Sequence, residues 1–240
     1  MTRLLTLLAV LFVVPALADT PTAFVNVNVV PMSSATLVRQ QTVIVDGGMV
    51  VEIGDVDTTP IPDHATVIDG TDRFLMPGLA EMHAHVPEAT SPSIDRYFNL
   101  YIANGVTTIR GMLGRPSHLD LRAGLESGDV FGPRLVTSGP SLNGRSVSGA
   151  VQAREMIEQQ HAAGYDFAKI HPGLEADEFE ALADAANGIG FPFAGHVTVA
   201  AGLQRILDQG QATIDHLDGY FVALLPPDSP GLGGFGGFFD

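Results

Sequence analysis

The sequence lacks cysteine altogether, and this absence excludes two kinds of site. With none among 240 residues, the chain can form neither a disulfide framework nor a thiolate metal site. The chain is also poor in positive charge, because 12 basic residues stand against 27 acidic ones and give a formal net charge of −15. This balance argues against nucleic acid or an anionic membrane surface as a partner.

Lysine is nearly absent as well. Eleven of the basic residues are arginine, and Lys169 is the only lysine. It lies in "DFAKIHPG", residues 166–173, an apolar run typical of a buried strand. Either a gene of biased composition left this lysine by chance, or the position needs an amine that a guanidinium cannot replace.

The first 18 residues are predicted to be a signal peptide. Arg3 gives a basic start, an apolar stretch follows from Leu4 to Val14, and Ala16 and Ala18 form a small-residue cleavage pattern. A membrane anchor is the alternative, but the stretch is shorter than the roughly 20 apolar residues that span a bilayer. We therefore expect a periplasmic or secreted protein without a transmembrane segment after cleavage at Ala18.

In the rest of the chain, the pattern of apolar and polar residues changes near residue 75. Residues 19–74 are rich in valine and isoleucine with partial alternation, and Asp46-Gly47-Gly48 predicts a hairpin turn. Residues 75–225 alternate short apolar strands with helical stretches, which predicts βαβ units and a parallel sheet. The predicted strands are 79–86, 105–113, 134–142, 166–173, 191–198 and 212–220, and the predicted helices are 93–105, 118–128, 151–164, 175–190 and 200–210.

An α/β barrel of the (β/α)₈ TIM type is the expected closed form, but it is expected to be incomplete. Such a barrel typically needs about 250 residues, whereas residues 75–240 supply 240 − 74 = 166. We expect about six of the eight strands. Residues 226–240, rich in proline and glycine, are expected to be a flexible tail.

Two histidines on the first barrel strand suggest a metal site. His83 and His85 lie two apart, so their rings face the same side of a strand. Two imidazoles aimed at one point are a metal-ligand geometry, although such a pair alone is weak evidence and is more often two solvated histidines at a strand edge. Lys169, His196 and His216 lie near the carboxyl ends of the fourth, fifth and sixth predicted strands, and barrel active sites are built at that end of the strands.

The ordered motifs resemble those of a known family. "LMPGLAEMHAHV", "GVTTIRGM", "DFAKIHPG", "AGHVTVAAGL" and "ATIDHLDGY" are similar to successive signatures of the amidohydrolase superfamily, in particular its metal-dependent imidazolonepropionase-like and prolidase-like members. The resemblance implies a deformed (β/α)₈ barrel with a small β-sandwich domain, of which residues 19–74 would be the N-terminal part. It also implies a binuclear divalent metal centre, usually zinc.

The resemblance assigns a role to each of the five nitrogen-bearing residues. His83 and His85 would bind the more buried metal, His196 and His216 the second, and Lys169 would bridge both as a carboxylated lysine formed with CO₂. A protonated amine cannot bind a cation, but burial lowers the pKa of a lysine, and the neutral amine can add CO₂. Arginine stays protonated and cannot do this.

The resemblance also implies a catalytic aspartate, for which no matching position is found in this sequence. Family members carry an aspartate at the end of the eighth strand, which binds metal and transfers protons, and the present sequence has no eighth strand. Asp215 and Asp218 flank His216 but are not expected to fill that place. No catalytic residue is therefore assigned. His171 and Tyr220 are candidates for substrate binding, and His118 is expected to be solvated.

The resemblance thus implies a metal-dependent hydrolase that acts on a carbon–nitrogen bond of a small-molecule substrate, such as an amide, a cyclic amide or a dipeptide. A catalytically impaired metal-binding fragment that lacks the strand-eight aspartate is the main alternative. A secreted binding module is a third, and replacing Lys169 would leave the metal content of such a module unchanged. The sequence leaves the oligomeric state open.

Overall fold

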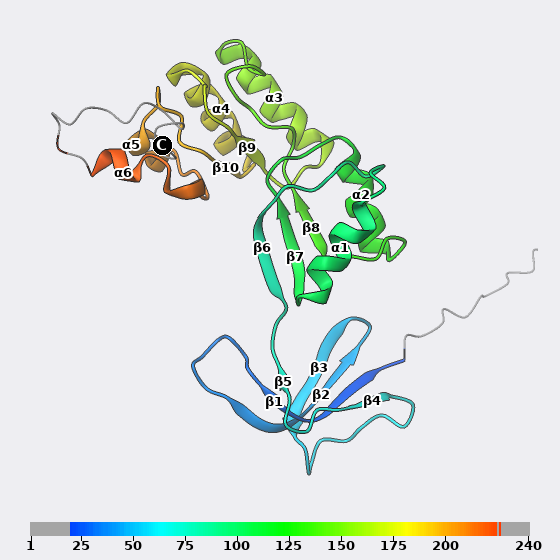
Figure 1. The fold of residues 1–240 in the computed structure, drawn as a ribbon. Coiled ribbons are helices and arrows are strands. Elements are labelled where there is room, and N and C mark those ends of the chain that lie inside the picture. Colours follow the sequence, from blue (N-terminus) through cyan, green and yellow to red (C-terminus); the bar gives the residue numbers. More distant parts are fainter. Residues whose placement is uncertain (1–19, 225, 227–240) are drawn as a thin grey trace, which may run out of the picture. The chain divides into compact units, whose positions relative to one another are not determined.

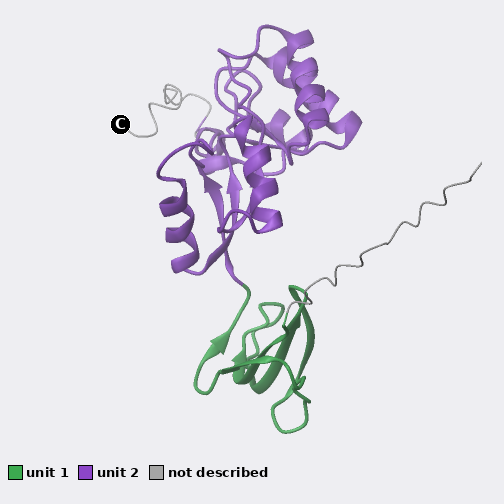
Figure 2. Cartoon of the chain, turned by 90° about the vertical axis from the view of Figure 1, so that its right-hand side faces the viewer, with its two compact units in different colours: residues 1–77 green, residues 78–240 purple. Residues whose placement is uncertain are grey.

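A computed structural model of the chain describes residues 20–224 and 226. The predicted signal peptide and nearly all of the predicted tail lie outside the described residues. The chain divides into two compact units, one up to Pro77 and the other from Gly78 (Figure 2). Within the described residues, no helix combines the length and the apolar character needed to cross a membrane.

The first unit is a five-stranded sheet built around β1 (Figure 1). Its strands are β1 (Thr22–Val29), β2 (Val38–Asp46), β3 (Met49–Asp55), β4 (Thr66–Asp69) and β5 (Phe74–Leu75). The order is β3-β2-β1-β4, and β5 also pairs with β1. β2 runs antiparallel to both β1 and β3, whereas β4 and β5 run parallel to β1.

The predicted hairpin turn joins β2 to β3. Asp46 pairs with Met49, and the two residues between them, Gly47 and Gly48, have φ angles of 53° and 75°. This left-handed pair is typical of a tight two-residue hairpin and is adopted readily by glycine. The sheet is thin, and large apolar side chains of β3 such as Val51 remain exposed.

The second unit contains five parallel strands that follow one another in chain order. They are β6 (Leu79–Ala84), β7 (Val106–Gly111), β8 (Arg134–Thr137), β9 (Ala168–Ile170) and β10 (Phe193–Gly195). β6, β7 and β8 form one sheet and β9 and β10 another. Two isolated parallel bridges, Ser138 with Phe167 and Leu142 with Ile170, link the segment that follows β8 to β9 and the residue before it. The α/β class is confirmed, while closure into a barrel stays a prediction.

All five predicted helices form, and three of them end at glycine. The helices are α1 (Ile94–Ala103), α2 (Ser117–Ser127), α3 (Ala150–Ala163), α4 (Ala176–Ile189), α5 (Leu203–Asp208) and the unpredicted α6 (Tyr220–Ala223). Gly128, Gly164 and Gly190 cap α2, α3 and α4 in the left-handed conformation. α3 packs against α4, and Phe179 of α4 lies in a core with Ile170 and other buried residues of the unit. This core supports the strand that carries Lys169.

The predicted sixth strand, residues 212–220, is wrong. Ile214 makes one parallel bridge to Gly195, and the chain then enters a short 3₁₀ helix, η1 (Asp215–Leu217). His216 and Leu217 have φ angles of 55° and 61°. Regular strand residues have a negative φ, so two successive left-handed residues turn the chain out of the extended conformation. His216 therefore lies on a tight turn instead of a strand.

Candidate metal centre

Five imidazole rings form a continuous row in the second unit. The ring centroids are 5.2 Å apart for His85 and His83, 4.8 Å for His83 and His216, 5.3 Å for His216 and His196, and 5.0 Å for His196 and His171. The row unites the four histidines predicted as metal ligands with one of the two candidates for substrate binding. Residues from β6, β9, β10 and η1 or the loops that follow them thus converge on one place.

His83 and His85 present matching nitrogens to each other. His83 lies in β6 and His85 directly after its end, on the same side of the extended chain. Their Nε2 atoms are 3.3 Å apart. Two nitrogens bound to one tetrahedral zinc ion, each about 2.0–2.1 Å from it, lie roughly 3.3–3.4 Å apart. The spacing of this pair therefore fits a single metal ion.

Lys169, on β9, has a fully buried side chain. Its Nζ donates to Oδ2 of Asp215, which is 3% exposed. Burial lowers the pKa of Lys169, although the Asp215 carboxylate opposes this shift. Burial alone would raise the pKa of Asp215, but Lys169 and His83 outweigh it, so this pKa lies below its usual value. The two residues form a buried ion pair that adjoins the row through Asp215 and His83.

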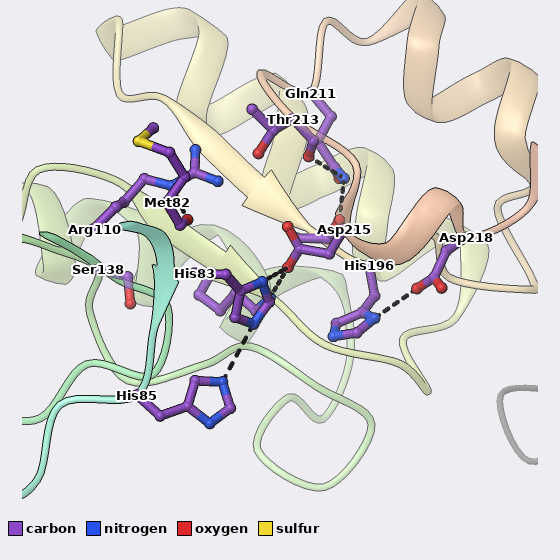
Figure 3. A network of polar contacts seen from close by, with 12 residues as sticks. Met82, His83, His85, Arg110, Ser138, His196, Gln211, Thr213, Asp215 and Asp218 are labelled. Carbon is purple, nitrogen blue, oxygen red and sulfur yellow. Dashed lines mark hydrogen bonds and ion pairs between the residues drawn. The ribbon is translucent and has the colours of Figure 1, made fainter. Parts of the chain in front are cut away.

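Asp215 also faces the second nitrogen of His83. Its Oδ2 is 3.6 Å from His83 Nδ1, so His83 lies between Asp215 on one side and His85 on the other (Figure 3). Together, His83, Asp215 and His216 offer ligand atoms that all lie within 4.8 Å of one another. Imidazole nitrogens and carboxylate oxygens are ligands that zinc and similar divalent metals accept. The donor set fits the metal that the sequence motifs imply.

His196 follows β10, and Asp218 fixes one of its ring nitrogens. Nδ1 of His196 is 2.5 Å from Oδ2 of Asp218 (Figure 3). Burial is the main cause that lowers the pKa of His83 and of His196, and it lowers the pKa of His171 to about 4. These rings are therefore neutral at neutral pH, which is the form that binds metal.

The two candidates for substrate binding lie in different surroundings. His171 borders an open cavity of about 510 Å³, together with Asn143, Gly144, Arg145, Pro172 and Gly173. Tyr220 is the first residue of α6 and is 38% exposed. A role in substrate binding stays a prediction for both.

The structure adds two site residues that sequence reasoning set aside, and it corrects one histidine. Asp215 and Asp218 both contact basic side chains of the site. A buried lysine needs an anion nearby, and this requirement was the signal that could have identified an aspartate beside His216. His118, expected in solvent, is fully buried, with Nε2 3.0 Å from the carbonyl oxygen of Pro87.

Solved structures with the same fold include several hydrolases. A Xaa-Pro dipeptidase with bound methionine matches 81% of the chain at 19% identity and a TM-score of 0.69. Bottromycin amidohydrolase matches 86% at 25% identity and a TM-score of 0.70, and molinate hydrolase matches 80% at 17% identity and a TM-score of 0.68. No protein-family model and no curated protein sequence matches the chain.

The matched structures are considerably longer than this chain. The matches cover 61% of the Xaa-Pro dipeptidase, 46% of bottromycin amidohydrolase and 56% of molinate hydrolase. At these identities the likeness is one of fold. The sequence motifs resembled those of the amidohydrolase superfamily, and the shared fold confirms this resemblance.

Proposed function

We propose that this chain, which shares the fold of prolidase and amidohydrolase structures, is a metal-dependent hydrolase or part of one. Its substrate would be a small molecule with a carbon–nitrogen bond, such as an amide, a cyclic amide or a dipeptide. The observation that carries the proposal is the row of imidazoles in the same unit as a fully buried lysine, whose ion-pair partner Asp215 also faces His83 of the row. The predicted periplasmic or secreted location belongs to the same proposal.

Four histidines would hold the metal. His83 and His85 would bind one divalent ion through the nitrogens that already face each other, and His216 and His196 would bind a second ion further along the row. Bound zinc lowers the pKa of a coordinated water and polarises a substrate carbonyl. These side chains would fix the positions of the ions at a partly buried site.

Lys169 would link the two ions as a carbamate. Its neutral amine can add CO₂, which forms a new nitrogen–carbon bond, releases a proton and leaves an anion with two oxygens. Burial favours the neutral amine, while the contact with Asp215 favours the ammonium form. Carboxylation therefore has to break the contact between Lys169 and Asp215.

Metal binding without turnover is a second candidate function, and one observation favours it. Both aspartates near the row already hold a basic side chain, since Asp215 contacts Lys169 and Asp218 contacts His196. Neither is therefore assigned the proton-transfer role that the family resemblance implies. Loss of a proton-transfer group typically slows a reaction about 10²- to 10⁴-fold.

Metal analysis with an activity screen tests the proposal. The purified chain would be loaded with zinc with and without bicarbonate, and then assayed with Xaa-Pro dipeptides, N-acyl amino acids and cyclic amides. We expect about two ions per chain with bicarbonate, and at most about one in Lys169→Arg. Arg154→Lys, which adds an exposed lysine, is the matched control and should behave as the unaltered chain.

Two outcomes would contradict parts of this proposal. Equal metal content in Lys169→Arg and in the unaltered chain would remove the bridging role of Lys169. Full metal loading without hydrolysis of any of these substrates would favour the second candidate function, metal binding without turnover.

A further inference from the structure

One irregularity of the parallel sheet lies beside the candidate metal centre. The register of the pairing between β6 and β7 shifts between Glu81 and Ala84. Two residues of β6, Met82 and His83, there lie opposite a single residue of β7, Arg110. This is the arrangement of a β-bulge, which is rare between parallel strands, interrupts the regular ladder and re-aims the side chains of the bulged strand. The direction in which His83 leaves β6 therefore depends on the bulge.

Side chains hold the backbone of both residues in the bulge. Nε of Arg110 donates to the carbonyl oxygen of Met82 at 2.8 Å (Figure 3). The backbone N–H of His83 donates to Oε1 of Glu81 at 2.7 Å. Arg110 and Glu81 are both half-buried, and hydrogen bonds in which one partner is ionised are roughly twice as strong as neutral ones. Two strong contacts thus replace the ladder bonds that a bulge interrupts.

Arg110 also reaches the segment that leads to Lys169. Its guanidinium carbon lies 5.7 Å from the centroid of the Phe167 ring, within the range of a cation–π interaction. Phe167 is 5% exposed and comes directly before β9. One arginine side chain therefore links the bulge in β6 to the start of β9, although the two strands belong to separate sheets.

We propose that Arg110 and Glu81 are positioning residues, which hold the bulge so that Nε2 of His83 stays beside Nε2 of His85, 3.3 Å away. The inference rests on the proposed function, because it concerns the aim of a proposed metal ligand. A ligand on a loose backbone has to be ordered when the ion binds, and a fixed bulge removes that cost. Both residues would act through the backbone of β6.

Cobalt titration of the full chain tests this proposal. Co²⁺ binding would be followed by absorption spectroscopy in the unaltered chain, Arg110→Met, Glu81→Met and Glu81→Gln, with Arg96→Met, at an exposed position of α1, as the control. We expect Arg110→Met and Glu81→Met to bind about 10-fold more weakly. Their spectra at saturating Co²⁺ should also change, which separates a displaced ligand ring from a general loss of stability. Glu81→Gln keeps an oxygen that accepts from the His83 N–H, so it should bind as the unaltered chain and Arg96→Met do.

Amide hydrogen exchange of the metal-free chain provides a second readout. The His83 amide should exchange about 10-fold faster in Glu81→Met than in the unaltered chain, and at the unaltered rate in Glu81→Gln. This comparison decides the case even where Arg110→Met fails to fold.

Three results would overturn the proposal. They are equal exchange of the His83 amide in all three chains, an unchanged Co²⁺ affinity and spectrum in both methionine variants, and a loss of affinity in Glu81→Gln as large as that in Glu81→Met. Failure of the unaltered chain to bind Co²⁺ would instead contradict the proposed function, and the exchange rates would still decide whether Glu81 holds the bulge.

Discussion

Asp215 contacts the amine of Lys169 where both side chains are withdrawn from solvent. Removing one member of a buried ion pair leaves an uncompensated charge, which typically costs about 3–5 kcal/mol, whereas removing both costs less. The relationship between these two residues therefore makes a quantitative prediction about stability that is independent of any metal.

A double-mutant cycle measures this coupling. We expect Lys169→Met and Asp215→Asn each to lower the free energy of unfolding by about 3 kcal/mol or more, and the double variant to lose about 1–3 kcal/mol less than the sum. Urea unfolding of the metal-free proteins gives the four values. Strict additivity would show that the contact contributes nothing to folding.

The buried ring of His118 predicts a loss of stability in acid. Burial lowers its pKa in the folded chain, with Arg115 acting in the same direction and Glu88 and the hydrogen bond to Pro87 opposing it. Between this lowered pKa and the unfolded value of about 6.5, the unfolded chain binds more protons. Stability should therefore rise with pH across this window, and decline as the pH falls below about 6.5.

Substitution of His118 isolates its share of this pH dependence. The Nδ1 atom of His118 is buried without a hydrogen-bond partner in the part of the chain that the structure describes. His118→Gln can still donate to the Pro87 carbonyl oxygen but cannot titrate, so the slope of unfolding free energy against pH should flatten. The same change at the exposed His64 should leave the slope as it was. An unchanged slope in His118→Gln would show that other groups cause the acid sensitivity.

Gly195 at the end of β10 should not tolerate a side chain. Its φ angle is 136°, and an added Cβ would lie 2.1 Å from the carbonyl oxygen of Ile170 on β9. We expect Gly195→Ala to lower the free energy of unfolding by about 3 kcal/mol or more, because neither backbone can move without breaking the pairing of the two strands.

Gly188 in α4 provides the matched control for Gly195. A Cβ at Gly188 would meet no atom within 4 Å, and alanine is favoured over glycine within a helix by about 1 kcal/mol. Gly188→Ala should therefore stabilise the chain in the same urea experiment. Similar effects of the two substitutions would contradict the close approach of β9 and β10.

Leu217 should be replaceable by glycine with a gain in stability. It has a φ angle of 61° and is 69% exposed, so its side chain contributes little packing against the strain of the left-handed conformation. We expect Leu217→Gly to raise the free energy of unfolding by about 0.5–1 kcal/mol. Leu224→Gly, at an exposed residue with a φ of −90°, should give no gain. Thermal unfolding of both variants checks the difference.

Local patterns in the sequence identified most of the second unit. Helices α2, α3 and α4 form where helical stretches were predicted, and they stop at glycines that adopt the left-handed conformation. Alternation along β6 correctly predicted that His83 and His85 face the same side. These features depend on neighbouring residues alone, which is why the sequence was sufficient for them.

The parts that the sequence did not reveal depend on contacts between distant residues. In a regular strand, Asp215 and His216 would face opposite sides, so only one of them could reach the site. The left-handed turn instead brings both residues to the row. No local sequence pattern predicts that two successive non-glycine residues adopt this conformation. Burial of His118 likewise depends on a carbonyl group 31 residues away, that of Pro87.

The candidate metal centre includes the turn at residues 215–218, so the ribosome completes this centre late in synthesis. His83 and His85 leave the ribosome long before this turn does, because synthesis proceeds from the amino end. Through most of translation, the nascent chain therefore offers a cation only one adjacent pair of imidazoles. The second pair of proposed ligands, His196 and His216, is therefore complete only once this turn has been synthesised.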